Sequence, residues 1–250
     1  MSTGSGIAGV HPAIAGAVPV LRARDHRFFT GMAIAATLTV FAGFARTYYL
    51  RSAFGSPELT TLLHVHGALS TSWILLFLTQ TSLVSARRTD LHRRLGVAGG
   101  ALVVAVMVAG YLTAIAGARR GAAPQGAASP LAFLSVPIGT VLVFGILAGA
   151  GLYWRRRSET HKRLMLLATI TILTPAIARV PRWFGPGGPP YTIGGTCLFV
   201  VACMAYDRAA HGRIHPAFLW GGLFLMLSLP LRFAVGNTDA WLSVARWLTE

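Results

Sequence analysis

The chain has 250 residues, of which 54% are apolar and 12% charged, and its mean hydropathy is +0.60. This composition excludes a water-soluble globule, because so few polar residues cannot cover one of this size, and it predicts an integral membrane protein. A net charge of +15 would suggest nucleic-acid binding in a soluble protein. Here the basic residues lie mainly in short loops between apolar runs. They indicate topology and contacts with membrane lipids, and we expect no nucleic-acid partner.

The N-terminal segment, residues 1–24, is predicted to be a mobile tail. Residues 1–21 are rich in Gly, Ala and Ser, and they lack the basic start of a cleavable signal peptide. Seven apolar runs follow, each long enough to cross the hydrocarbon core of a bilayer as a helix. They cover roughly residues 28–50, 62–85, 94–118, 131–153, 162–180, 191–206 and 216–235. The sequence therefore predicts an all-α, seven-helix transmembrane domain over residues 25–236.

The distribution of basic residues predicts the orientation of these spans. Of the 22 basic residues, 14 lie in the N-terminal segment and the even-numbered loops. By the positive-inside rule this side is cytoplasmic, so the N-terminus is inside and the C-terminus, after seven spans, is outside. We expect a multi-pass protein of a bacterial inner membrane. Residues 237–250 carry Trp241 and Trp247 among other apolar residues and are predicted to form an interfacial helix on the outer face.

Local residues predict several helix ends and irregularities. Asp90 and Thr160 precede the third and fifth spans and are predicted to cap them, and Pro216 suits the first turn of the seventh. Pro175 and Pro230 fall inside the fifth and seventh spans. A proline frees backbone carbonyls in a helix, and these need partners inside the bundle.

Two related tetrads carry the sharpest functional signal. His92 opens the sequence His-Arg-Arg-Leu and His161 opens His-Lys-Arg-Leu, each where a basic loop meets a long apolar run. The third and fifth spans run in the same direction, so both tetrads lie at the same membrane level. Histidine is the commonest metal ligand and arginine the usual clamp for carboxylates. The pattern predicts that His92 and His161 hold a haem iron, with Arg93 and Arg163 on its propionates.

Two other interpretations of the tetrads stay open. A histidine among arginines at a helix start can simply cap the helix and contact lipid phosphate, and similar basic loops arise readily from topology selection. Alternatively, His92 and His161 could bind zinc together with His26 or His215.

A second group of polar residues lies toward the outer ends of the spans, although no acidic residue falls inside any predicted span. Intramembrane cations are costly and normally pair with something, so these residues predict a ligand pocket occupied by lipid phosphate, a quinone or a small anion. The alternative is that the arginines extend outward to lipid headgroups. The predicted pocket consists of His66, Arg46, Arg179, Arg232, Tyr49 and Trp73.

The segment from His66 through Trp73, followed by a basic loop and Leu91-His92-Arg93, resembles the second-to-third helix region of the cytochrome b561 group. In that group a four-helix core carries two haems, each bridged by histidines from alternate helices. The resemblance implies that His92 and His161 form the inner pair and that His66 is one outer ligand. The fourth span and its leading loop contain no histidine, so at most one b-type haem is implied.

The tetrads are also similar to a broad class of uncharacterised bacterial membrane proteins in which alternate spans open with His-Arg or His-Lys, a resemblance that brings no established activity. Three functions therefore stay open: a b-type haem electron-transfer protein, a transporter or ligand-binding protein for a small anion or lipid, and a non-catalytic membrane assembly factor. Hydrolases, proteases and kinases are disfavoured, because the chain has no Gly-x-Ser-x-Gly, phosphate loop or His-Glu-x-x-His.

Overall fold

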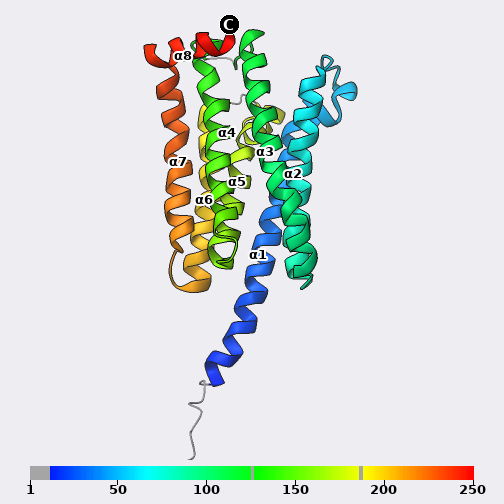
Figure 1. The fold of residues 1–250 in the computed structure, drawn as a ribbon, viewed down its shortest axis with the longest axis vertical. Coiled ribbons are helices and arrows are strands. Elements are labelled where there is room, and N and C mark those ends of the chain that lie inside the picture. Colours follow the sequence, from blue (N-terminus) through cyan, green and yellow to red (C-terminus); the bar gives the residue numbers. More distant parts are fainter. Residues whose placement is uncertain (1–11, 125–126, 186–187) are drawn as a thin grey trace, which may run out of the picture.

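A computed structural model describes residues 12–124, 127–185 and 188–250, with side chains described from residue 23 onward. Within these residues, seven helices are long and apolar enough to cross a membrane, which confirms the predicted all-α, multi-pass fold (Figure 1). These seven are α1 (Pro12–Phe44), α2 (Thr61–Ser85), α3 (Thr89–Arg119), α4 (Pro130–Tyr153), α5 (Ser158–Ile177), α6 (Pro189–His211) and α7 (Pro216–Gly236). Shorter elements are η1 (Ala45–Tyr49), η2 (Arg51–Phe54), η3 (Val180–Trp183) and α8 (Asp239–Thr249).

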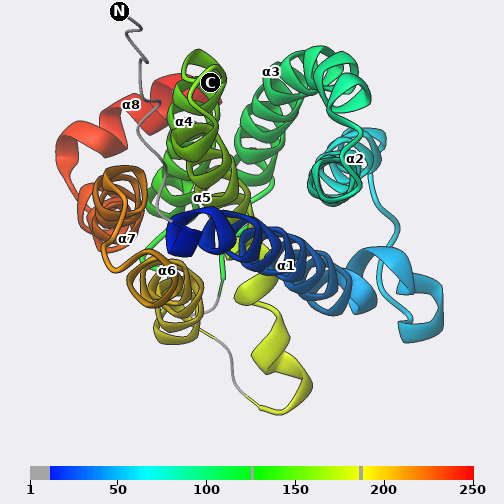
Figure 2. The ribbon, with the colours of Figure 1, turned by 90° about the horizontal axis from the view of Figure 1, so that it is seen from below.

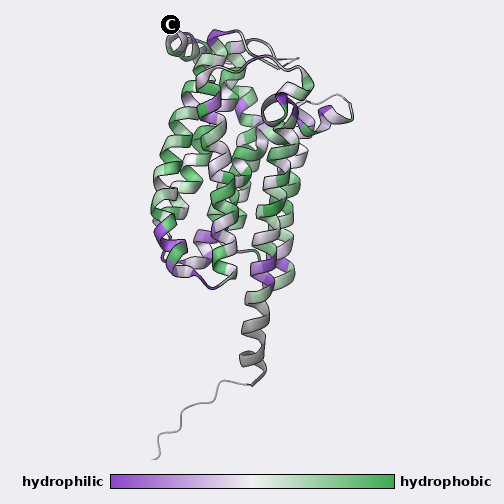
Figure 3. Cartoon of the chain, turned by 90° about the vertical axis from the view of Figure 1, so that its right-hand side faces the viewer, coloured by the Kyte–Doolittle hydropathy of each residue, from purple (hydrophilic) through white to green (hydrophobic). Residues whose placement is uncertain are grey.

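Helix α5 lies at the centre of the bundle and contacts α1, α4, α6 and α7 (Figure 2). Its sequence is apolar or carries only hydroxyl groups on every face of its middle turns, as expected for a helix that is buried all round. Each residue from Leu166 through Ile170 is 0% exposed. The other helices are polar at both ends of the bundle and apolar between them, which fits a lipid environment (Figure 3).

Helices α1 to α5 form a closed ring, because α1 packs on α2, α2 on α3, α3 on α4, α4 on α5 and α5 on α1. Helices α6 and α7 pack against α5 from outside this ring. We call the end with the α2–α3, α4–α5 and α6–α7 connections the inner end, after the predicted topology, and the opposite end the outer end. The ring brings the starts of α3 and α5 to the inner end together.

The predicted caps of the third and fifth spans are wrong by two or three residues. Helix α3 begins at Thr89 after Arg88, and α5 begins at Ser158 after Arg157, so Asp90 and Thr160 lie within the first turns. The apolar run marks the hydrocarbon core, whereas the backbone hydrogen bonds of a helix continue into the polar headgroup region. Asp90 still favours the positive end of the helix dipole. The prediction for Pro216 is confirmed, since it is the first residue of α7.

The predicted N-terminal tail, residues 1–24, divides into two parts. Residues 1–11 lie outside the described residues, whereas residues 12–24 continue the helix α1, which extends beyond the inner end of the bundle (Figure 1). Pro12 suits the first turn of a helix. The prediction took alanine as a sign of a tail, although Ala13, Ala15 and Ala17 are strong helix formers.

Prolines lie inside α5 and α7 as predicted, and Pro137 lies inside α4. Pro175 lacks the N–H that would bond to the carbonyl of Thr171. The hydroxyl of Thr174 donates to this carbonyl instead, at 3.0 Å. A neighbouring hydroxyl therefore supplies the missing partner inside the bundle.

The C-terminal helix α8 lies across the outer ends of α3 and α4 (Figure 1). Thr238 caps it by accepting from the backbone N–H of Trp241. The indole of Trp241 donates to the carbonyl of Leu131 at 2.9 Å, whereas Trp247 is 74% exposed. One face thus packs on the bundle while the other presents an aromatic side chain outward, as in an interfacial helix.

The membrane orientation can be tested by topology reporters. Fusions after Arg88 and Arg157, in the loops of the inner end, are expected to report the cytoplasm, because these loops carry most of the positive charge. A fusion after Arg120, in an outer loop, is expected to report the opposite side. Alkaline phosphatase and fluorescent-protein fusions measure this directly, and a reversed signal at any one junction would contradict the orientation.

Candidate functional site

His92 and His161 lie next to each other at the inner end. Their ring centroids are 6.2 Å apart and their ring planes are inclined by 81°. His92 comes from the first turn of α3 and His161 from the first turn of α5, so two helices that are not neighbours in the ring contribute one imidazole each. Both side chains are half-buried.

Nδ1 of His161 is hydrogen-bonded to the backbone, because it lies 2.8 Å from the carbonyl oxygen of Gly151. In a neutral ring, Nδ1–H donates to this carbonyl and leaves the lone pair on Nε2, which is the usual arrangement of a metal-binding histidine. Nδ1 of His92 and Oε1 of Gln80 are buried and have no partner among the described residues. Polar atoms at this place are thus not fully satisfied by protein groups.

The distance between the two rings is consistent with two axial ligands of one metal. Metal–nitrogen bonds of about 2 Å each place two coordinating nitrogens about 4 Å apart, so ring centroids somewhat further apart are expected. The observed centroid distance is 6.2 Å. In the described part of the chain, no third His, Cys or carboxylate joins the pair at ligating distance. The structure therefore does not support a zinc site that includes His26 or His215.

Helix α3 has a glycine-rich face beside His92. Gly96, Gly99 and Gly100 follow at i+4, i+7 and i+8, and therefore lie on the same face of the helix as His92. An added Cβ at Gly96 would lie 3.9 Å from the amide nitrogen of Gln80, and one at Gly100 would lie 3.9 Å from a methyl of Leu152, but one at Gly99 would come within 3.3 Å of a methyl of Leu76. This face thus has no side chains of its own over two turns, and Leu76 of α2 packs against it at Gly99.

Arg163 does not point to the histidine pair, contrary to the prediction that it binds a haem propionate. It is 1% exposed, and its Nε and Nη2 donate to the carboxylate of Asp207 at 2.9 Å and 2.7 Å. Its Nη1 donates to Glu159 at 2.6 Å. Arg93 lies beside His92 on α3 and is exposed, so it remains the arginine of the predicted pair that can reach a ligand there.

Asp207 is not among the predicted site residues, because the predicted sixth span ends one residue before it. Helix α6 continues to His211, so acidic residues do occur inside the spans, against the prediction. Asp207 is 0% exposed and also accepts from the backbone N–H of His215 at 2.9 Å. An acid at the same membrane level as Arg163 is the sequence feature that could have pointed to Asp207, because a buried arginine needs a carboxylate partner.

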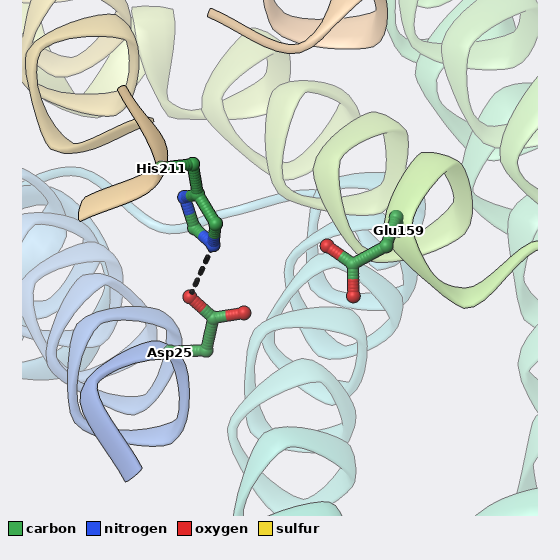
Figure 4. Close-up of side chains that lie close together, drawn as sticks. All are labelled: Asp25, Glu159 and His211. Carbon is green, nitrogen blue, oxygen red and sulfur yellow. Dashed lines mark ion pairs between the residues drawn. The ribbon is translucent and has the colours of Figure 1, made fainter. Parts of the chain in front are cut away.

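A polar network continues from this pair toward α1. The ammonium of Lys162 lies 2.5 Å from Oδ2 of Asp25, and the hydroxyl of Tyr206 donates to Oδ1 at 2.5 Å. Nε2 of His211 is 3.3 Å from the same Oδ1 (Figure 4). These contacts join α1, α5 and α6 at the inner end.

Asp25, Glu159 and His211 have ligand atoms within 4.8 Å of one another, a spacing that a metal ion can use (Figure 4). The ammonium of Lys162, however, binds both carboxylates, at 2.5 Å to Asp25 and 2.8 Å to Glu159. It supplies the positive charge that a metal would bring. We therefore assign this group to an ion-pair network and not to a metal centre.

The residues of the predicted outer pocket lie in separate places. Arg46 lies 5.3 Å from the ring centroid of Phe54 and 5.5 Å from that of Trp183. Arg179 lies 4.7 Å from the ring centroid of Phe44, and its Nη1 donates to Pro175 O at 2.6 Å. These two arginines thus contact aromatic rings near the outer ends of α1 and α5.

Other members of the predicted pocket pack inside the ring. The hydroxyl of Tyr49 bonds to that of Thr71 at 2.7 Å, and the indole of Trp73, 2% exposed, donates to Thr169 at 3.3 Å. His66 faces Gly110 on α3, where an added Cβ would lie 3.8 Å from its Cε1.

Arg232, the last predicted member, lies between α7 and α4. The structure therefore does not bring the predicted residues to one cavity. A cavity of about 390 Å³ occurs elsewhere, lined by Val180, Pro181, Phe184, Gly185 and Tyr191.

Comparison with known proteins found no family model, no curated protein and no solved structure that matches this chain. The fold itself defines the class, which is a multi-pass helical membrane protein.

His215 makes the start of α7 sensitive to pH. Its Nδ1 accepts from the backbone N–H of Ala217 at 3.1 Å, which requires an unprotonated ring. Burial, followed by the charge of Arg163, lowers the pKa of His215, although Asp207 and Glu159 oppose this. A histidine with a lowered pKa in the folded state binds fewer protons than in the unfolded state. Its contribution to stability is therefore complete above pH about 6.5 and is lost as the pH falls through the folded pKa.

We expect the free energy of unfolding to fall by about 1 kcal/mol on acidification below this pH, the usual value of an N-cap. Thermal unfolding in detergent between pH 5 and 8 measures the effect. His215→Asn is the matched control, because asparagine caps a helix without titrating. If acidification lowers the free energy of unfolding of His215→Asn by as much as that of the wild type, the assignment to His215 is contradicted.

Proposed function

We propose that this protein is a b-type haem protein of a bacterial inner membrane, and that it transfers single electrons. The observation that carries the proposal is the approach of His92 and His161, with ring centroids 6.2 Å apart, from two different membrane-spanning helices. Two imidazoles without a third ligand suit a haem better than zinc, which prefers four protein or water ligands in a tetrahedron.

When bound, a haem supplies one-electron oxidation and reduction, and the protein supplies its surroundings. Gly151 would orient His161 and increase the basicity of its Nε2, because the carbonyl accepts from Nδ1–H. Gly96 and Gly100, on the face of α3 next to His92, would let a flat group approach the helix backbone. Arg93 is the candidate partner of a propionate, while Arg163 stabilises the fold through Asp207.

An optical spectrum tests the proposal. Protein purified in detergent from haem-replete cells is expected to show a Soret band and, after reduction with dithionite, sharp α and β bands. Extraction of the haem and quantification against protein should give one haem per chain. A colourless preparation that is folded by circular dichroism and gel filtration would refute the proposal. Two haems per chain would contradict the assignment to a single histidine pair.

A further inference from the structure

Arg232 is a buried cation inside the membrane-spanning part of α7. The residue is only 6% exposed. Its Nη1 donates to the hydroxyl of Thr140 on α4 and its Nη2 to the hydroxyl of Ser228, both at 2.8 Å. Its Nε is buried and has no hydrogen-bond partner among the described residues.

The partners of Arg232 do not neutralise its charge. Both hydroxyl groups use their own protons elsewhere, since Thr140 donates to Val136 O and Ser228 to Leu225 O. All seven acidic residues of the chain lie in the described part, and none of them forms an ion pair with Arg232. A guanidinium at this depth without a counter-charge is costly, so an intramembrane arginine of this kind marks a site for an external partner.

The contact between α4 and α7 fixes the position of the guanidinium. An added Cβ at Gly139 would come within 2.7 Å of Cγ and 3.1 Å of Nε of Arg232, so only glycine lets the side chain lie against α4. The carbonyl of Arg232 accepts from the hydroxyl of Ser135 at 2.8 Å, which joins the two helices next to the site. The arginine is therefore held in one place with N–H groups that have no hydrogen-bond partner, and a guanidinium of this kind matches the oxygens of a carboxylate or a phosphate.

We propose that Arg232, with Thr140 and Ser228, binds a phosphate-type oxyanion at the contact between α4 and α7. The site lies four residues before the end of α7, about 6 Å along the helix, so a group at the membrane surface can reach it. Leu227 and Leu231, on the outward face of the same helix, are 67% and 60% exposed, so α7 presents a face to the lipid next to the site. The anion is inorganic phosphate from solution or the phosphate of an anionic phospholipid. This site is independent of the proposed haem.

The test measures the thermal unfolding midpoint of the full chain in two arms. In detergent, sodium phosphate is titrated against sodium chloride at constant ionic strength. In nanodiscs without free phosphate, phosphatidylglycerol is compared with phosphatidylcholine. A ligand whose concentration is well above its Kd is expected to raise the unfolding midpoint by roughly 5 °C. A rise in the first arm identifies free phosphate, and a rise only in the second identifies a lipid. Equal midpoints in all conditions, or an equal rise with chloride, would overturn the proposal.

Variants assign the response to this site. Arg232→Met is expected to lose the response and, without phosphate or anionic lipid, to unfold at or above the wild-type midpoint, because it removes an unneutralised charge. Arg232→Lys keeps the charge but loses the paired N–H donors of the guanidinium. Roughly tenfold more phosphate should therefore be needed for the same rise in midpoint, which is the equivalent of one charge-assisted hydrogen bond. Arg120→Gln, in an outer loop, is the matched control and should respond like the wild type. A full response in Arg232→Met would place the anion elsewhere and overturn the proposal.

Discussion

Replacing either His92 or His161 by alanine is expected to abolish the Soret band, because each supplies one of the two axial ligands of the proposed haem. The two rings are 6.2 Å apart, and loss of either leaves a single ligand on a group buried among helices. His66→Ala is the matched control. His66 faces Gly110, which follows His92 by 18 positions and therefore lies about 27 Å further along α3. Its removal should leave the absorption spectrum unchanged.

A second measurement separates loss of ligation from loss of folding. The alanine variants leave a space of the size of one imidazole, so added imidazole is expected to restore part of the Soret absorbance. Circular dichroism should show the same helix content in all three variants. An unchanged band in His92→Ala and His161→Ala would contradict the ligand assignment, even if the wild-type protein contains haem.

Removing the carboxylate of Asp207 is expected to destabilise the protein by about 3–5 kcal/mol, the usual effect of leaving one partner of a buried ion pair alone. Arg163 and Asp207 are 1% and 0% exposed, and their charge-assisted hydrogen bonds are 2.7 Å, 2.9 Å and 3.2 Å long. Asp207→Ala also removes the acceptor for the backbone N–H of His215. Unfolding by increasing mole fractions of SDS measures the change in free energy.

Three variants give this prediction its controls. Asp207→Asn keeps an acceptor oxygen without the charge and should lose less stability than Asp207→Ala. Glu159→Gln changes a side chain that is 54% exposed, so we expect a loss of at most about 1 kcal/mol. The double variant Arg163→Met with Asp207→Leu removes both charges and should recover much of the loss. If Asp207→Ala has the same free energy of unfolding as the wild type, the Arg163–Asp207 pair does not stabilise the bundle.

The class of protein and the number of spans could be predicted from the sequence, because the length of an apolar run reports directly on the thickness of a bilayer. The ends of the helices could be predicted less well. Hydropathy marks the hydrocarbon core, but α6 continues past it to His211 and so includes Asp207. The same limit hid the ion pair that holds Arg163. At the N-terminus, a composition rich in alanine fits both a tail and the helix that starts at Pro12.

The part of the candidate site that could be predicted is the part that depends only on the membrane depth of its residues. His92 and His161 open two helices that run in the same direction, so their common level follows from the chain order. The outer pocket failed because depth does not determine which way a side chain faces around its helix. Arg232 faces α4, Trp73 faces α5, and Arg46 contacts the aromatic rings of Phe54 and Trp183. Tertiary packing sets these directions, and no short pattern in the sequence encodes them.

Electron paramagnetic resonance of the oxidised protein tests the central claim most directly, because it reports the axial ligands of a haem iron and their relative orientation. The imidazole planes of His92 and His161 are inclined by 81°. Two nearly perpendicular imidazoles predict a low-spin ferric signal with strong anisotropy. A high-spin signal would contradict ligation by both histidines, and folded protein with no haem signal would contradict haem binding altogether.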